Sequence, residues 1–202
     1  MIKVALTGNI GMGKTTVGKV FSSLGALVIN TDDVVSQLLN SDEVKKRIIA
    51  VFGRGILSDQ VIDKKALAEL VFNDAKKRAE LEDIIHPLVF EEVDRIASNT
   101  GKDCILIVEA PIIFERGYQG LFDKTITVFC DENTAINRLM SKGINKDDAI
   151  ARIRAQMPIE KKCALSDFLI DNNKGINDLY DQVLAIYKIL ERMADGRGKG
   201  DI

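Results

Sequence analysis

The sequence predicts an α/β protein built on a five-stranded parallel sheet with helices on both faces. Short apolar runs alternate with segments of helical periodicity, which is the pattern of parallel strands joined by helices. A glycine-rich turn follows the first apolar run directly and precedes the first helical pattern. These observations favour an open sheet that binds its ligand at the carboxyl ends of the strands.

The expected elements follow from the lengths and periods of the apolar patterns. Strands are predicted at residues 2–7, 26–30, 104–108, 125–130 and 168–171. A first helix is predicted to start at about residue 15. Further helices are predicted at 32–39, 42–52, most of 64–98, 131–141 and 176–193. Pro87 is expected to bend the long charged segment or to begin a new helix within it. Residues 52–62, which contain Gly53 and Gly55, are expected to form a loop.

Composition suits one soluble core, or one core with a small insertion, in a chain of 202 residues. The net charge of −2 gives no overall basic field for nucleic acid or a membrane surface. No apolar run approaches the roughly 20 residues that span a bilayer, and no signal-peptide pattern precedes the first strand. The three cysteines have no paired spacing, so neither structural zinc nor a disulfide framework is indicated. We expect a cytoplasmic monomer or small homo-oligomer.

The glycine-rich turn carries the strongest functional signal. Residues 8–15, GNIGMGKT, fit the P-loop pattern G-x-x-x-x-G-K-[ST], so the fold prediction becomes a P-loop NTPase sandwich. Glycines allow the backbone to wrap around phosphate oxygens, and the start of the following helix adds positive potential. A lysine in this position reaches the β and γ phosphates, and the following hydroxyl holds Mg²⁺. The residues predicted to bind ATP are Gly8, Gly11, Met12, Gly13, Lys14, Thr15 and Thr16, with Thr15 also predicted as the metal contact.

Two carboxylates follow other predicted strands. Asp32 comes after the second strand, which we expect to neighbour the P-loop strand, and it can orient an acceptor hydroxyl and take its proton. The alternative is that Asp32 or Asp33 only caps the next helix. Glu109 ends the third strand, where it either lies near Mg²⁺ or pairs with a lysine or arginine.

Cations gather in and just before the charged segment 142–162. Transfer of a phosphoryl group requires positive charge, and a mobile flap can supply it while excluding water. Arg138 is predicted to stack on the base or to face the phosphates, and Arg152 to bind nucleotide; the alternative is a solvated helix face. His86 is either a packed residue or a ligand contact. Asn173-Lys174 suggests a GTPase, but the acid that would read guanine is replaced by Ile176.

The order of several segments resembles the dephospho-coenzyme A kinase family over residues 2–193. The P-loop is shared by many kinases, whereas the other segments are more specific. The segments similar to the family's motifs are VINTD at 28–32, IHP at 85–87, APIIFE at 110–115, RLM at 138–140, ARIRAQ at 151–156 and SDFLIDN at 166–172.

The resemblance implies transfer of the γ-phosphoryl group of ATP to the ribose 3′-hydroxyl of dephospho-coenzyme A, the last step of coenzyme A synthesis. It implies that Asp32 is the base, that Lys14 and Arg138 are catalytic, and that Asp32, His86 and Pro111 contact the acceptor. The domains it implies are a nucleotide-binding core at 1–59, 101–141 and 163–193, an acceptor domain at 60–100, a lid at 142–162 and a frayed tail at 194–202.

Three positions depart from the family pattern. Ser36 stands where the family usually has an arginine, Asn30 replaces an acidic residue, and Lys142 replaces an arginine near the lid. Lysine keeps the charge but lacks the bidentate fork of arginine. Two other functions stay open: a different small-molecule or nucleoside monophosphate kinase, and a nucleotide-sensing module without transfer activity.

Overall fold

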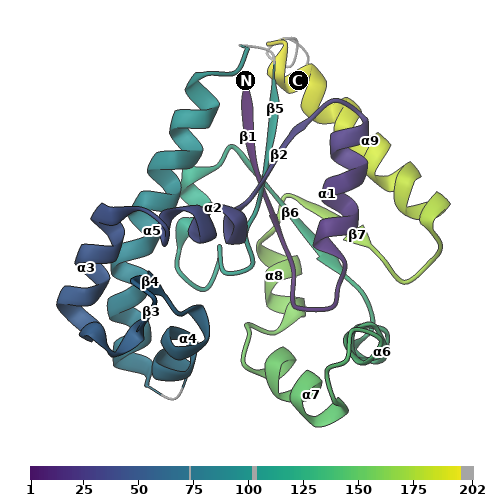
Figure 1. Ribbon diagram of the computed structural model, residues 1–202. Helices are drawn as coiled ribbons and strands as arrows, with labels where there is room; N and C mark the ends of the chain where they lie inside the picture. The colour runs from purple at the N-terminus through teal and green to yellow at the C-terminus, as the bar shows by residue number, and fades with distance from the viewer. Residues whose placement is uncertain (73, 102–103, 197–202) are drawn as a thin grey trace. The chain divides into compact units, whose positions relative to one another are not determined.

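The computed structural model describes residues 1–72, 74–101 and 104–196 and divides into two compact units (Figure 1). The first unit contains residues Met1–Asn30 and Thr100–Ile202, and the second contains Thr31–Asn99. The predicted acceptor domain at 60–100 covers the C-terminal part of the second unit, which also includes residues 31–59. Most of the predicted frayed tail, residues 197–202, lies outside the described residues.

The first unit is built on the predicted five-stranded parallel sheet, with strand order β2-β5-β1-β6-β7. All four strand pairs are parallel. The strands are β1 (Ile2–Thr7), β2 (Leu27–Asn30), β5 (Ile105–Glu109), β6 (Lys124–Phe129) and β7 (Phe168–Asp171). One expectation was wrong, because β2 does not neighbour the P-loop strand β1. The more apolar β5, buried along its whole length, lies between them.

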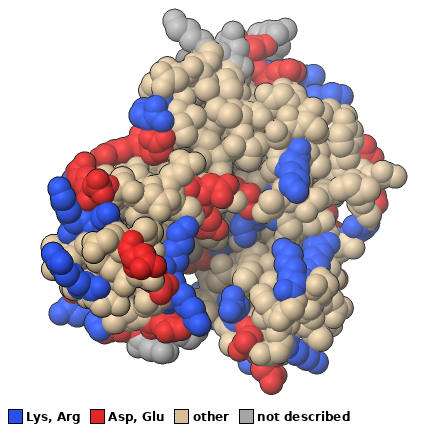
Figure 2. Space-filling view, viewed as in Figure 1, with Lys and Arg blue, Asp and Glu red and all other residues tan. Residues whose placement is uncertain are grey.

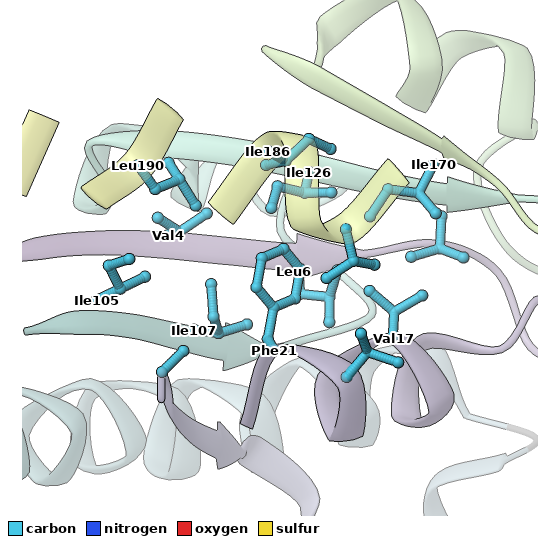
Figure 3. Close-up of a cluster of buried hydrophobic side chains, with 14 of the residues drawn as sticks. Val4, Leu6, Val17, Phe21, Ile105, Ile107, Ile126, Ile170, Ile186 and Leu190 are labelled. Atoms are coloured by element: carbon cyan, nitrogen blue, oxygen red, sulfur yellow. The ribbon is translucent and has the colours of Figure 1, made fainter. Parts of the chain in front are cut away.

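Helices α1 (Lys14–Ser23) and α9 (Ile176–Ala194) cover one face of this sheet and pack against each other (Figure 1). Alternate residues of the strands point toward these helices, as the period of a strand requires. Figure 3 shows the resulting core, in which Phe21 of α1 lies among Leu6 and Ile107 of the sheet, with Ile186 of α9 nearby. The α/β sandwich is therefore held by burial of branched aliphatic side chains.

The opposite face carries α8 (Ile159–Leu165) beside β6. Ala5, on the strand face opposite to Val4 and Leu6, packs with Ala110 and Ile113. The short turn η2 (Tyr118–Leu121) follows. Two further helices, α6 (Glu132–Met140) and α7 (Lys146–Arg154), pack together around a small apolar cluster that includes Met12 of the glycine-rich turn.

The second unit is mainly helical, with α5 (Ala75–Ser98) contacting each of the other three helices. Its elements are α2 (Thr31–Leu38), α3 (Asp42–Phe52), η1 (Arg54–Ile56), β3 (Leu57–Ser58), β4 (Val61–Ile62), α4 (Lys64–Phe72) and α5. The loop expected at 52–62 instead contains a hairpin, whose turn residues Asp59 and Gln60 both have positive φ. This is the two-residue turn that matches strand twist, although it lacks the usual glycine. Pro87 lies inside α5, and the helix continues through it.

Positive and negative side chains are interspersed on the visible face of each unit (Figure 2). This distribution agrees with the net charge of −2, and the visible face of neither unit carries a wide area of one sign of charge. Across the part of the chain that the structure describes, no helix combines the length and apolar character needed to cross a membrane.

Asp167 fastens the start of β7 to β6. Its carboxylate accepts hydrogen bonds from Lys124 Nζ (2.9 Å), Thr125 N (2.8 Å) and Thr125 Oγ1 (2.8 Å). Burial acts to raise the pKa of Asp167, but the hydrogen bonds from Lys124 and Thr125 outweigh it and lower the pKa below its ordinary value of 3.8. Because this pKa is lower in the folded state, the carboxylate stabilises the fold above the unfolded-state pKa and loses that effect as the pH falls through the folded-state pKa.

We predict that Asp167→Asn lowers the free energy of unfolding by about 1 kcal/mol at about pH 7, allowing for solvent screening. The difference from the parent protein should shrink on acidification to about pH 3, as measured by urea unfolding. Asp181→Asn, at an exposed position of α9, is the matched control and should show no such pH-dependent difference. A deficit in Asp167→Asn that stays constant with pH would contradict this account.

Candidate active site

The loop between β1 and α1 has no room for side chains at its three glycines. Gly8, Gly11 and Gly13 all have positive φ. A Cβ at Gly11 would lie 2.7 Å from the carbonyl oxygen of Ala135, and one at Gly8 would collide with the carbonyl oxygen of Val128. At these glycines the loop therefore presents backbone rather than side chains, which is the surface that cradles phosphate oxygens.

Helix α1 starts at the end of this loop. Gly13 caps it in the left-handed conformation and makes no side-chain capping bond, and the amides of Thr16 and Val17 donate to its carbonyl oxygen at 3.0 and 3.2 Å. The first N–H groups of a helix lack intrahelical acceptors, so they favour an anion at this end. Thr16, predicted to bind nucleotide, lies in this first turn.

Lys14 curls back over the loop. Its Nζ donates to the carbonyl oxygens of Gly8 (2.8 Å) and Asn9 (3.3 Å). Backbone carbonyls of the loop therefore hold the ammonium group beside it. The position suits its predicted contact with the phosphates, which stays a prediction.

Thr15 and Glu109 join the loop helix to the end of β5. The Thr15 hydroxyl donates to Glu109 Oε1 at 2.8 Å, and Glu109 is 7% exposed. A hydroxyl oxygen beside a carboxylate is the hard-oxygen ligand chemistry that Mg²⁺ prefers. The contact fits a place near the metal, and both alternatives for Glu109 stay predictions.

Arg138 and Asn172 line the other side of the loop. Asn172 Nδ2 donates to the carbonyl oxygen of Met12 (2.9 Å), and Arg138 Nη2 donates to that of Asn172 (2.9 Å). Arg138 Nη1 is 3.7 Å from where a Cβ of Gly13 would lie, and it donates to Cys130 Sγ at 3.6 Å. Burial raises the pKa of the Cys130 thiol although Arg138 opposes it, so the thiol stays neutral beside the cation. Arg138 thus lies next to the phosphate loop, as its predicted role requires.

The segment between α7 and α8 holds the first half of the loop. Gln156 Oε1 accepts from the amide of Ile10 (2.7 Å), and Asn9 Nδ2 donates to the carbonyl oxygen of Met157 (3.0 Å). Neither contact is predicted by local sequence pattern. Gln156 lies in the segment at 151–156 that is similar to a family motif, but its position there does not indicate that it reaches a loop amide 146 residues away in sequence.

The remaining predicted residues lie as follows. Arg152 is exposed in the last turn of α7, whereas Arg154 lines a cavity of about 720 Å³ together with Asn9 and Met12 of the loop. Pro111 follows β5, and its carbonyl oxygen accepts from Thr7 Oγ1 at 3.1 Å. The roles of Arg152 and Pro111 stay predictions.

Two predicted acceptor contacts belong to the second unit. Asn30, the last residue of β2, pairs in register with Glu109, and Asp32 follows two residues later, exposed in the first turn of α2. His86 lies half-buried within α5, where burial lowers its pKa although Asp83 opposes the shift. A neutral, half-buried imidazole fits either packing or a ligand contact, so both interpretations of His86 remain.

The glycine-rich loop follows the central strand of a parallel sheet, with Lys14 against the loop and the Thr15–Glu109 pair at its end. This arrangement is that of a P-loop kinase. The same fold occurs in shikimate kinase from Bacteroides thetaiotaomicron, with a TM-score of 0.53 and 16% identity over 94% of this chain and 98% of that one. At this identity the likeness shows the fold alone.

The family is shown by sequence. The family model for dephospho-CoA kinase (CoaE) matches residues 2–178. Dephospho-CoA kinase from Aquifex aeolicus is 36% identical over 194 residues, covering 95% of this chain and 99% of that protein. The crystal structure of TT1252 from Thermus thermophilus has a TM-score of 0.83 and 29% identity, covering 93% of this chain and 96% of that one. The chain belongs to the dephospho-CoA kinase family, as the resemblance predicted.

We predict that Gly11→Ala weakens ATP binding by about tenfold or more, because positive φ alone costs about 1–2 kcal/mol and the methyl group also meets Ala135. Gly120→Ala is the matched control, since a Cβ there meets nothing within 4 Å. Calorimetric titration with ATP measures both variants, and thermal unfolding checks that each is folded. Unchanged affinity in Gly11→Ala would contradict the backbone cradle.

Proposed function

We propose that the protein transfers the γ-phosphoryl group of ATP to the ribose 3′-hydroxyl of dephospho-coenzyme A. The observation that carries this proposal is the glycine loop with Lys14 folded over it and the Thr15–Glu109 pair at its end. Membership of the dephospho-CoA kinase family supports the choice of acceptor.

The loop and its cations act on the phosphates. Backbone N–H groups from Gly11 to Thr16 bind the phosphate tail, and Lys14 exchanges its loop carbonyls for phosphate oxygens. Arg138, adjacent to Gly13, stabilises the negative charge of the migrating group or stacks on the base. Little covalent chemistry is required of the protein, since positioning and electrostatic stabilisation provide most of the rate acceleration in phosphoryl transfer.

Thr15 and Glu109 fit a magnesium ion that accompanies ATP. The Thr15 hydroxyl would bind it directly, and the buried Glu109 carboxylate would bind it or its water shell. The ion supplies neutralisation of phosphate charge when it is bound. The residues of this chain supply only oxygen ligands there, which suits Mg²⁺ better than a softer metal.

The acceptor and lid assignments complete the proposal. Asp32 orients the acceptor hydroxyl and takes its proton, with His86 and Pro111 forming part of the acceptor site. Residues 60–100 bind the acceptor, and residues 142–162, which include α7 and the first half of α8, close over the nucleotide and bring in Arg152.

Incubating the purified protein with ATP, Mg²⁺ and dephospho-coenzyme A tests this function directly. Mass spectrometry should detect coenzyme A, formed only when all three are present. Parallel reactions with nucleoside monophosphates or shikimate should release far less ADP. A preference for one of these acceptors would favour a different P-loop kinase, and ATP binding without any transfer would indicate a nucleotide-sensing module.

We predict that Asp32→Asn lowers kcat by about 100-fold to 10,000-fold, because the amide cannot accept the proton of the attacking hydroxyl. Binding of ATP should survive, since Asp32 belongs to no part of the phosphate loop. Steady-state rates and ATP titrations measure the two effects. Asp33→Asn is the neighbouring control, and retained turnover in Asp32→Asn would remove the base assignment.

A further inference from the structure

Lys162 is a charged residue with no exposed surface. Its side chain in α8 is 0% exposed, and its ammonium group contacts the carbonyl oxygen of Pro111 (2.6 Å) and Glu115 Oε1 (2.7 Å). Complete burial is rare for lysine and requires paired, hydrogen-bonded surroundings. The proposed function gives this residue no task.

The ion pair is a poor source of stability. Burial lowers the pKa of Lys162 although Glu115 opposes the shift, so desolvation outweighs the attraction to the carboxylate. Glu115 Oε2 is buried and has no hydrogen-bond partner among the described atoms. Buried pairs of this kind are often replaceable by apolar residues without loss of stability. Its presence therefore suggests a task other than stabilising the fold.

Two short routes connect this ion pair to the phosphate loop. On one route, the Pro111 carbonyl oxygen that accepts from Lys162 also accepts from Thr7 Oγ1 (3.1 Å), and Thr7 immediately precedes Gly8. The atoms on both sides of this carbonyl are buried or half-buried. This carbonyl oxygen therefore joins Lys162 to the residue from which the loop starts.

The second route runs through the carboxylate. Glu115 Oε1 accepts from the amide of Met157 at 3.4 Å, and the carbonyl oxygen of Met157 accepts from Asn9 Nδ2. The adjacent Gln156 accepts from the amide of Ile10. Gln156 and Met157, which lie between α7 and α8, therefore contact the loop, and Glu115 of the ion pair contacts Met157.

We propose that Lys162 is a positioning residue for ATP binding, which holds the loop from Thr7 to Ile10 in its phosphate-binding conformation through Pro111 and Glu115. The inference rests on the proposed function only in taking ATP as the nucleotide. It also implies that the C-terminal end of the predicted lid stays attached to the core, because Gln156, Met157 and Lys162 make these contacts.

The test separates positioning from stability with an apolar replacement of the pair. Lys162→Met alone should raise the Kd for ATP by about tenfold and lower Tm, since Glu115 loses its partner. The double variant Lys162→Met with Glu115→Leu removes both charges, so Tm should recover while the ATP Kd stays raised. A Kd that returns to the parent value together with Tm would overturn the proposal, as would normal ATP affinity in Lys162→Met.

Gln156→Leu keeps the proposal testable if the double variant does not fold. It removes the acceptor of the Ile10 amide while leaving the ion pair intact, so it should raise the ATP Kd with little change in Tm; unchanged affinity would count against positioning. Lys188→Met, at an exposed position of α9 outside the predicted lid, is the control and should leave the ATP Kd unchanged. Calorimetric ATP titration needs no acceptor, so failure of the dephospho-coenzyme A assay would not affect the outcome.

Discussion

The structure depends on one steric constraint, which is that Gly8, Gly11 and Gly13 are too closely packed to carry side chains. The loop lies against Val128 of β6, Ala135 of α6 and the Asn172 side chain, and each contact replaces space that a Cβ would need. Because the glycines leave the backbone uncovered at these three positions, its N–H groups can form the phosphate-binding surface. The surrounding elements are arranged to keep those contacts.

The strand order explains how the site collects its polar groups. Strand β1 is central, so its loop lies between the ends of β5 and β6. Glu109 arrives from β5 to meet Thr15, and Arg138 arrives on the helix that follows β6. Central placement in a parallel sheet thus surrounds one loop with groups from both neighbours, as expected at the carboxyl ends of such strands.

Features that depend on local pattern could be predicted from the sequence. The P-loop, the five strands and most helices follow from spacing and hydrophobic period, and the structure confirms them. The position of β2 beyond β5 could not be inferred, because a parallel crossover of this length can reach either strand. The hairpin at Asp59 and Gln60 was missed because Gln60 stands where the usual Asp-Gly turn has its glycine, and glutamine is not a usual signal for positive φ.

Tertiary contacts at the site were beyond the reach of local pattern. A buried lysine is uncommon, so the composition of α8 gives no indication that Lys162 turns inward to Glu115. The same holds for Gln156 and Asn172, whose amides bind loop atoms from 146 and 160 residues away in sequence. The resemblance to a family marked the segments that contain them but did not state what they touch.

The central claim is that backbone N–H groups of the loop, rather than side chains alone, receive the phosphates of a nucleoside triphosphate. Backbone amide NMR during titration with ATP measures this most directly. The account predicts that the largest shift changes and the strongest protection from hydrogen exchange occur at Gly11, Gly13, Lys14 and Thr15. Saturating ATP that leaves these amides unchanged, while perturbing others, would contradict it.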